Sequence, residues 1–311
     1  MLSLRPLGFG TKQEKAWKKP NNIQAQNVYA AAKHLSKKGM NMTISFLNHS
    51  FAAQLETDAV KGIQQIMDAW TTLPSGNTVY TLVWDQGIAV FGGEGCPINE
   101  AIGLGIEEPI TVETLQWVEA FYDSYSYPST IRVCSLADSS FIDLVQQRGY
   151  RLAGFSHRWI LDLTSWKSPL ATRDPRIHLA APGEEMLWAR TVATGFATEE
   201  ADDNESFDFE RALFRMSSGI PVIAFENGLP AGAGMLALND GIAALFATST
   251  QLSFRRKGLH MGLLDWRLRH AQQHGMRWAT IETDPGSDSQ RNVERIGFRL
   301  AYVTAKLILP V

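Results

Sequence analysis

Three cations followed by a glycine, Arg255-Arg256-Lys257-Gly258, are the residues of this sequence whose types and spacing best suit ligand binding. A strand is expected to end near Thr250, just before them, and an amphipathic helix begins directly after them. The start of a helix carries free backbone N–H groups and the positive end of the helix dipole. Such a loop can hold a pyrophosphate, so the sequence predicts a site for a phosphorylated cofactor.

The elements around this loop alternate between strand and helix patterns. Strands are expected at Ile177–Ala180, Pro221–Phe225, Ala233–Ala237, Ile242–Thr250, Trp278–Glu282 and Tyr302–Leu309, and helices near Gly183–Thr194, Phe207–Met216, Leu259–His274 and Asp288–Ile296. The pair Asn227-Gly228 predicts a hairpin turn. In the helix after the loop, two neighbouring apolar stripes are expected to be buried: Leu259, Leu263 and Trp266, and Leu264, Leu268 and Ala271.

The first half of the chain repeats the end of the second. Gly149-Tyr150-Arg151-Leu152-Ala153 aligns with Gly297-Phe298-Arg299-Leu300-Ala301 at an offset of 148 residues. The same offset pairs the strand Thr130–Cys134 with Trp278–Glu282, and the helix Ser139–Arg148 with Ser287–Ile296. A duplicated domain explains this pattern. The alternative is that two unrelated strand–helix–strand units look alike.

Breaks in periodicity divide the chain into four segments. Residues 1–41 are polar and rich in lysine, and they predict a flexible arm with one helix near Ala25–Leu35. Residues 42–165 form a first domain, 166–176 a linker containing Pro169 and Pro175, and 177–311 a second domain. Whether the arm belongs to the natural protein is left open, because Met40 or Met42 could also be the start.

Composition excludes several classes of protein. With 311 residues, 45% hydrophobic content and a net charge of −3, the chain reads as a folded protein without a general attraction to nucleic acid or anionic membranes. No apolar run reaches the ~20 residues of a membrane span. Two cysteines, Cys96 and Cys134, exclude a disulfide framework and favour a cytoplasmic setting. His270 and His274 are one turn apart but lack a third ligand nearby, so no metal is expected.

The loop, the element order and the closing Gly297-Phe298 together resemble the GNAT superfamily of acyl-coenzyme A-dependent N-acyltransferases. Its loop pattern is Gln or Arg, any two residues, Gly, any residue, then Gly or Ala, and here it falls on Arg255–His260. The resemblance covers about 177–311, and residues 43–163 look like a degenerate second copy. It implies an α/β (α+β) fold of two such domains, each a mixed, mostly antiparallel sheet flanked by helices. His260 departs from the pattern, and its side chain either points away harmlessly or adds charge to the phosphate site.

The resemblance also implies how the cofactor, acetyl-coenzyme A, would bind. The phosphates would lie on Arg255, Arg256, Lys257, Gly258, Leu259 and His260. The pantetheine arm would run along the strand before the loop, beside Thr248, Ser249 and Thr250. A backbone N–H in that strand would polarise the thioester carbonyl. The alternative for these small polar residues is an ordinary edge strand.

The reaction implied is direct attack of an amine on the thioester in a ternary complex. Glu282, at the end of a central strand, is the expected general base, with Glu226 a weaker candidate. The family often has a tyrosine four residues before the Gly of Gly-Phe to protonate the leaving thiolate, but this chain has Val293 there. Ser289 and Asn292 on the same helix are the expected substitutes, and Asn292 is also expected to contact the cofactor. Each has a plain alternative, a surface carboxylate or a solvated helix face.

The acceptor is expected to be a primary amine, of a small molecule or of a protein or peptide. Seven carboxylates between Glu199 and Glu210 would attract a cation near the entrance, unless they are only a solvated loop. The first half reads as silent, because Glu107, Glu108 and Pro109 stand where the basic loop would be. A monomer or homodimer is expected. The competing hypothesis is a non-catalytic sensor or regulatory module that binds acyl-coenzyme A.

Overall fold

A computed structural model describes residues 47–74, 78–196 and 207–310 of the chain, within one compact unit. The predicted arm 1–41, its helix near Ala25–Leu35, and positions 197–206 of the acidic connection lie outside the described residues. The three boundaries between the four predicted segments stay predictions.

The described strands form one sheet in the order β1-β2-β3-β4-β11-β5-β10-β9-β8-β7-β6. The strands of the first half are β1 (Tyr80–Trp84), β2 (Gly87–Phe91), β3 (Ala101–Leu104), β4 (Ser129–Cys134) and β5 (Arg151–Asp162). Those of the second half are β6 (Ile177–Leu179), β7 (Gly219–Glu226), β8 (Leu229–Asn239), β9 (Ile242–Thr250), β10 (Trp278–Thr283) and β11 (Arg299–Leu309). Among the described strands only β3–β4 and β9–β10 pair in parallel, so the predicted mixed, mostly antiparallel sheet is confirmed.

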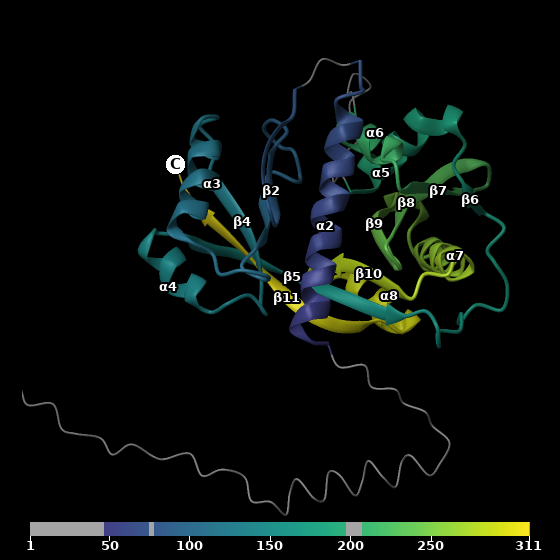
Figure 1. Ribbon diagram of the computed structural model, residues 1–311. Helices are drawn as coiled ribbons and strands as arrows, with labels where there is room; N and C mark the ends of the chain where they lie inside the picture. Colours follow the sequence, from purple (N-terminus) through teal and green to yellow (C-terminus); the bar gives the residue numbers. More distant parts are fainter. Residues whose placement is uncertain (1–46, 75–77, 197–206, 311) are drawn as a thin grey trace, which may run out of the picture. The chain divides into compact units, whose positions relative to one another are not determined.

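Helices cover this sheet (Figure 1). They are α2 (His49–Trp70), α3 (Val112–Asp123), α4 (Ser140–Gln147), α5 (Glu185–Phe196), α6 (Asp208–Arg215), α7 (Leu259–Gln273) and α8 (Asp288–Ile296). Short 3-10 turns at Pro182–Glu184 and Leu252–Phe254 precede α5 and α7. The element order of the second half and the repeated strands and helices at the 148-residue offset are thus as the sequence predicts. The hairpin turn is confirmed too, with positive φ at Asn227 (54°) and Gly228 (78°).

The last strand of each half lies next to strands of the other half. β5 pairs with β10 from Asp162 opposite Trp278 to His157 opposite Thr283, and β11 pairs with β4 from Cys134 opposite Thr304 onward. The two exchanged strands pair with each other in the centre, and neither pairs with the strand that precedes it in its own half. Because the two repeats are alike, each offers the other the same kind of strand edge.

Helix α2 belongs to the first half but packs on both. Asn48 begins it by accepting a hydrogen bond from Phe51 N at 2.8 Å. Ala52 and Leu55 pack with Cys134, Ile160, Ile242 and Tyr302 over the central strands, where Figure 1 draws the helix in purple. Further along, Ile66 and Trp70 join a core that also contains Trp188 and Leu213 of the second half.

The predicted apolar stripes of α7 are both buried. Leu259, Leu263 and Trp266 join a cluster with Ile177 and Val222, whereas Leu264, Leu268 and Ala271 pack with Trp159 and Phe298. Two separate clusters on neighbouring sides of one helix fix its rotation about its own axis. The loop at its start is therefore held in place by the whole length of the helix.

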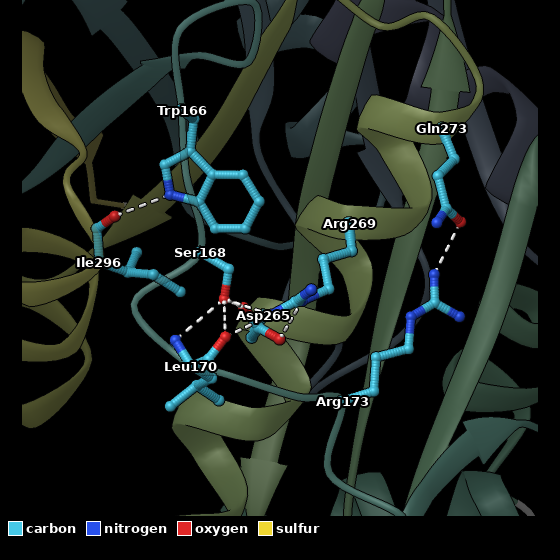
Figure 2. A network of polar contacts seen from close by, with 8 residues as sticks. All are labelled: Trp166, Ser168, Leu170, Arg173, Asp265, Arg269, Gln273 and Ile296. Carbon is cyan, nitrogen blue, oxygen red and sulfur yellow. Dashed lines mark hydrogen bonds and ion pairs between the residues drawn. The ribbon is translucent and has the colours of Figure 1, made fainter.

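The connection between the halves is tied to α7 (Figure 2). Ser168 donates a hydrogen bond to Asp265, a carboxylate that is 1% exposed, and Arg269 bonds both Asp265 (2.8 Å) and Ser168 (2.7 Å). Trp166 donates its indole N–H to the Ile296 carbonyl at 3.1 Å. The predicted linker 166–176 thus contains an anchored stretch, because the buried Asp265 carboxylate is satisfied by Ser168 of the linker and by Arg269.

Candidate active site

Strands β9 and β10 begin as a parallel pair and then separate. Their ladder runs from Ile242 opposite Trp278 to Leu245 opposite Ile281. β9 continues to Thr250 paired only with β8, while β10 stays with β5 to Thr283. Past Leu245, the backbone groups of β9 on the β10 side have no ladder partner. An extended ligand can pair with them as an added strand would.

β9 also bulges at the start of this unpaired stretch. Phe246 pairs with Met235 and Ser249 with Ala233, so that Ala247 and Thr248 together oppose the single residue Gly234. Ala247 has φ of 49°, in the left-handed region, which costs a residue with a Cβ about 1–2 kcal/mol. Bulges redirect backbone groups, and strained residues gather at functional sites.

The basic loop follows the end of β9. Gly258 is the N-cap of α7 with φ of 80°, and no side chain caps the first turn of the helix. Arg255 bonds the carbonyls of Thr250 (3.1 Å) and Gly195 (3.2 Å), and Lys257 Nζ lies 3.7 Å from the Glu226 carboxylate. Arg256 makes no hydrogen bond or ion pair with the residues that the structure describes. The loop is thus held in shape while its helix N–H groups and Arg256 stay available to an anion.

His260 is the second residue of α7 and bonds Asn292 of α8 at 3.2 Å between Nδ1 and Nδ2. Burial, with the charge of Arg267 adding to it, lowers the pKa of His260 to about 4. The imidazole is therefore neutral at pH 7 and adds no charge to the phosphate site. Its structural effect is to join the first turn of α7 to the middle of α8.

A cavity of about 700 Å³ opens at the split between β9 and β10. Both halves of the chain line it. Its apolar wall includes Ile63 and Ile66 of α2, Val192 and Phe196 of α5, and Phe209 and Leu213 of α6. Its polar and charged lining includes Asp58, Glu100, Arg132, Arg158, Thr248, Glu282 and Ser289.

No family model matches this sequence, and no curated protein does. Among solved structures it is similar to a GCN5-related N-acetyltransferase from Kribbella flavida, with 13% identity over 84% of this chain and 96% of the other, and a TM-score of 0.58. It is also similar to a GCN5-related N-acetyltransferase from Sphaerobacter thermophilus, with 15% identity over 79% of this chain and 84% of the other, and a TM-score of 0.52. A third similar structure is a tandem GNAT protein from the clavulanic acid biosynthesis pathway, with 12% identity over 80% of this chain and 94% of the other, and a TM-score of 0.51.

The chain has the tandem GNAT fold. The resemblance in the loop and in the element order therefore extends to the arrangement in space. Identities this low show the fold alone, so the chemistry must be argued from the side chains. That the first GNAT copy is degenerate stays a prediction.

Glu282 lies on the last part of β10, beside the opening where β9 and β10 separate (the slot), and lines the cavity. It is bound by two guanidinium groups, Arg158 at 2.8 Å and Arg132, which also contacts Glu100 at 3.3 Å. Burial opposes its charge, but these arginines outweigh it and lower the pKa of Glu282 below its ordinary value. A carboxylate held in this way is a weak base, so its predicted catalytic role needs a second candidate.

Asp58 of α2 is that second candidate, and the sequence carried no signal for it. It lines the cavity and is 8% exposed. Burial raises the pKa of Asp58 to about 6, partly offset by a hydrogen bond with Asn239 and by the charge of Arg158. A carboxylate that titrates near neutral pH is suited to accept a proton. Asp58 belongs to the first half, which the sequence predicts to bind no cofactor.

The position where GNAT enzymes often have a tyrosine is closed to chemistry here. Val293 is 0% exposed and packs in the core beneath α8. Ser289 lines the cavity, whereas Asn292 contacts His260 and does not line it. The neighbouring Ser287 accepts from Gln290 N at 3.1 Å, so its hydroxyl caps α8.

Of the other predicted site residues, some line the cavity and some do not. Thr248 lines the cavity. Ser249 is turned to α5, where its hydroxyl donates to the Thr191 carbonyl at 3.2 Å, and the buried Thr250 hydroxyl has no partner in the described part of the chain. The side chain of Leu259 is in the core, which leaves only its backbone for a ligand. Glu226 pairs with Arg176 (2.6 Å) and is not among the residues lining the cavity.

Two further observations concern groups outside the slot. His270 and His274 stack with ring centroids 4.1 Å apart, and the described residues contain no cluster of three or more potential metal ligands. None of the described helices has the length and apolarity that crossing a membrane would require.

Proposed function

We propose that this protein transfers an acyl group, acetyl in the simplest case, from acyl-coenzyme A to a primary amine. The observation that carries the proposal is the opening between β9 and β10, which joins a strained bulge, an uncapped helix start with a basic loop, and a cavity. The tandem GNAT fold supports the same reaction class.

The cofactor would bind from the loop inward. Its pyrophosphate accepts hydrogen bonds from backbone N–H groups at 256–260, beside the available cation Arg256. Its pantetheine amides pair with the free edge of β9 past Leu245. That path ends at Ala247 and Thr248, where a backbone N–H of the bulge would polarise the thioester carbonyl.

The acceptor is proposed to be a cationic amine, of a small molecule or of a peptide. Five carboxylates line the cavity, Asp58, Glu100, Glu210, Glu282 and Asp284, against two guanidinium groups, Arg132 and Arg158. This excess of negative charge attracts an ammonium group. Its apolar wall also favours an amine that carries a hydrophobic part.

The chemistry needs three proton movements. The ammonium loses a proton, and Asp58 is the better base of the two carboxylates because its pKa lies near 6 while that of Glu282 is lowered. The amine nitrogen then forms a bond to the thioester carbon, the nitrogen of this adduct loses a second proton to solvent, and the carbon–sulfur bond breaks to release the thiolate. The thiolate takes up a proton from solvent or through Ser289. A thiolate is a tolerable leaving group, so the absence of a tyrosine at position 293 is compatible with turnover.

A non-catalytic module that binds acyl-coenzyme A is the second candidate. Two observations favour it: Val293 replaces the usual acid, and Glu282 is neutralised by two arginines. This candidate shares the cofactor site and differs in having no acceptor chemistry.

A thermal-shift titration with acetyl-coenzyme A tests the shared part. A ligand that binds only the native state raises stability by about 2.7 kcal/mol at a hundred times its Kd. Gly258→Asp places a negative charge at the start of α7 and should abolish the response. Gly275→Asp is a matched control, because Gly275 also has positive φ (74°) and open space around it but lies beyond the other end of the helix. No response in the unmodified protein would end both proposals.

Turnover separates the two candidates. Release of free thiol from acetyl-coenzyme A, with and without a panel of primary amines, should depend on the amine for an enzyme. Binding of the cofactor without amine-dependent thiol release across the panel would favour the sensor.

A further inference from the structure

Arg267 is a buried cation in the middle of α7, and most of its bonds leave the helix. It is 0% exposed. Its Nη1 donates to the carbonyls of Met235 (2.8 Å) and Phe246 (3.3 Å), and its Nη2 donates to the Thr248 hydroxyl (2.7 Å). Only Nε stays within the helix, on the Leu263 carbonyl at 2.9 Å. The guanidinium is therefore bonded to both strands at the bulge.

The residue opposite the bulge is a glycine, which leaves room for the Arg267 side chain. Gly234 is the residue opposite Ala247 and Thr248, and a Cβ placed on it would lie 2.8 Å from Nη1 and 2.9 Å from Cζ of Arg267. A larger residue there would push the guanidinium away. The arginine thus binds on either side of the strained Ala247 and holds its left-handed conformation in place.

The positive charge of Arg267 is uncompensated. No carboxylate among residues 47–74, 78–196 and 207–310 forms an ion pair with it, and burial lowers the pKa of its guanidinium to about 9. A group with that pKa is still charged at pH 7. Burying an unpaired charge is costly, so a use for it is expected where it lies. It lies behind the end of the slot where the proposed thioester carbonyl would gain negative charge.

We propose that Arg267 is a positioning residue that holds the β9 bulge in the shape that polarises the acyl thioester, and that its buried charge favours the developing oxyanion. This inference rests on the proposed acyl-coenzyme A function. It assigns a role to a charged residue whose place on the helix, between two buried apolar stripes, puts it in the core.

The test measures the carbonyl stretching band of bound acetyl-coenzyme A and needs no acceptor amine. Infrared spectra of acetyl-coenzyme A labelled with ¹³C at the carbonyl would be recorded free and bound. A carbonyl polarised by the bulge shifts to lower wavenumber on binding to the unmodified protein. In Arg267→Met the cofactor should still bind within roughly tenfold of the original affinity while the shift is lost, because the loop is unchanged. Where an amine substrate is found, kcat should fall roughly tenfold to a hundredfold with a smaller change in KM.

Arg269→Met is the matched control. Arg269 lies two residues along the same helix and bonds the linker network instead of the bulge, so its loss should leave the shift in place. Gly234→Ala is a second variant that keeps the charge but displaces the guanidinium, and it should reduce the shift even if Arg267→Met does not fold.

The outcomes distinguish this inference from the proposed function. A protein that does not bind acetyl-coenzyme A overturns the proposed function. One that binds it without a shift, or that keeps the full shift in a folded Arg267→Met or Gly234→Ala variant, overturns the role of Arg267 alone. Loss of the shift in Arg269→Met to the same extent would also overturn it, because the effect would then be general to the helix.

Discussion

The slot between β9 and β10 is open, whereas its counterpart between β3 and β4 is closed. In the first half, the Gly105 carbonyl accepts from Asp138 N at 2.8 Å just after the parallel pair ends, so the backbones stay bridged. Ile106 and Ile110 are buried beside it, and a Cβ on Gly105 would lie 3.0 Å from Ile110. The same order of elements thus gives an open slot in one half and a packed core in the other.

The helix starts differ in the same direction. Thr111 caps α3 by accepting from Thr114 N at 3.1 Å, whereas no side chain caps α7. Two acids and a proline precede α3, and three cations precede α7. The filled slot, the capped helix and the acidic sequence each make the first half less suited to a phosphate group than the second half.

The first half nonetheless contributes to the cavity of the second. Asp58, Glu100, Arg132 and Arg158 all line it. The two halves therefore contribute differently to the cavity: the second half provides the opening between β9 and β10, and the first half provides part of the wall and four of the charged groups that line it.

The largest expected effect comes from separating the halves. Residues 47–165 and 177–311 expressed alone should each fail to give a cooperative thermal transition, because β4 and β10 lose the exchanged strands that cover their edges. Co-expression should restore a complex with the near-ultraviolet circular dichroism of the whole protein. A cooperatively folded, monomeric 177–311 fragment would show that the exchange is dispensable.

A smaller effect is expected from Asp58→Asn, which tests the contribution of the first half to the site. The folded protein keeps the Asp58 proton to about pH 6, while the unfolded chain releases it near 3.8. The folded state therefore binds more protons between these values, and stability falls as pH rises through that window. The variant should be more stable than the original above pH 6 by about 3 kcal/mol and equal to it near pH 3.5.

Chemical denaturation across pH measures this difference, and amine-dependent thiol release measures the accompanying loss of activity. Asp240→Asn, which removes an exposed carboxylate paired with Lys61, is the control and should show neither effect. Unchanged turnover in Asp58→Asn would remove Asp58 as the base.

The smallest effect concerns the helix caps. Thr111→Ala should destabilise the protein by about 1 kcal/mol, because the first turn of α3 loses its hydrogen-bond acceptor. It should leave acetyl-coenzyme A binding unchanged in the thermal-shift assay. Cofactor binding that changes together with the cap of α3 would mean that the first half takes part in binding the cofactor.

Local patterns in the sequence predicted most of the elements. The 148-residue offset matched β4 with β10, α4 with α8, and the start of β5 with that of β11, and periodicity fixed both buried stripes of α7. The strand exchange could not be predicted, because two similar repeats offer each last strand two equivalent places in the sheet. Pairing between strands far apart in sequence leaves no local signal.

The site was predictable only in part. The basic loop and the position of Glu282 follow from the order of elements, but the two arginines on Glu282 come from strands of the other half. Asp58 lies on a helix that no motif connects to the site. Arg267 did leave a signal, since it follows Leu263 by four residues and so falls among the apolar residues of α7.

The exchange of strands has a consequence for synthesis on the ribosome. β5 is made before any strand of the second half, yet its two neighbours in the sheet, β10 and β11, are the last to be translated. Until then β5 has no strand partner and β4 is paired only with β3, so that both have exposed edges, and such edges attract other nascent chains. Protection of these strands until translation is nearly finished, by a chaperone or by slow folding, would be part of how this molecule reaches its native state.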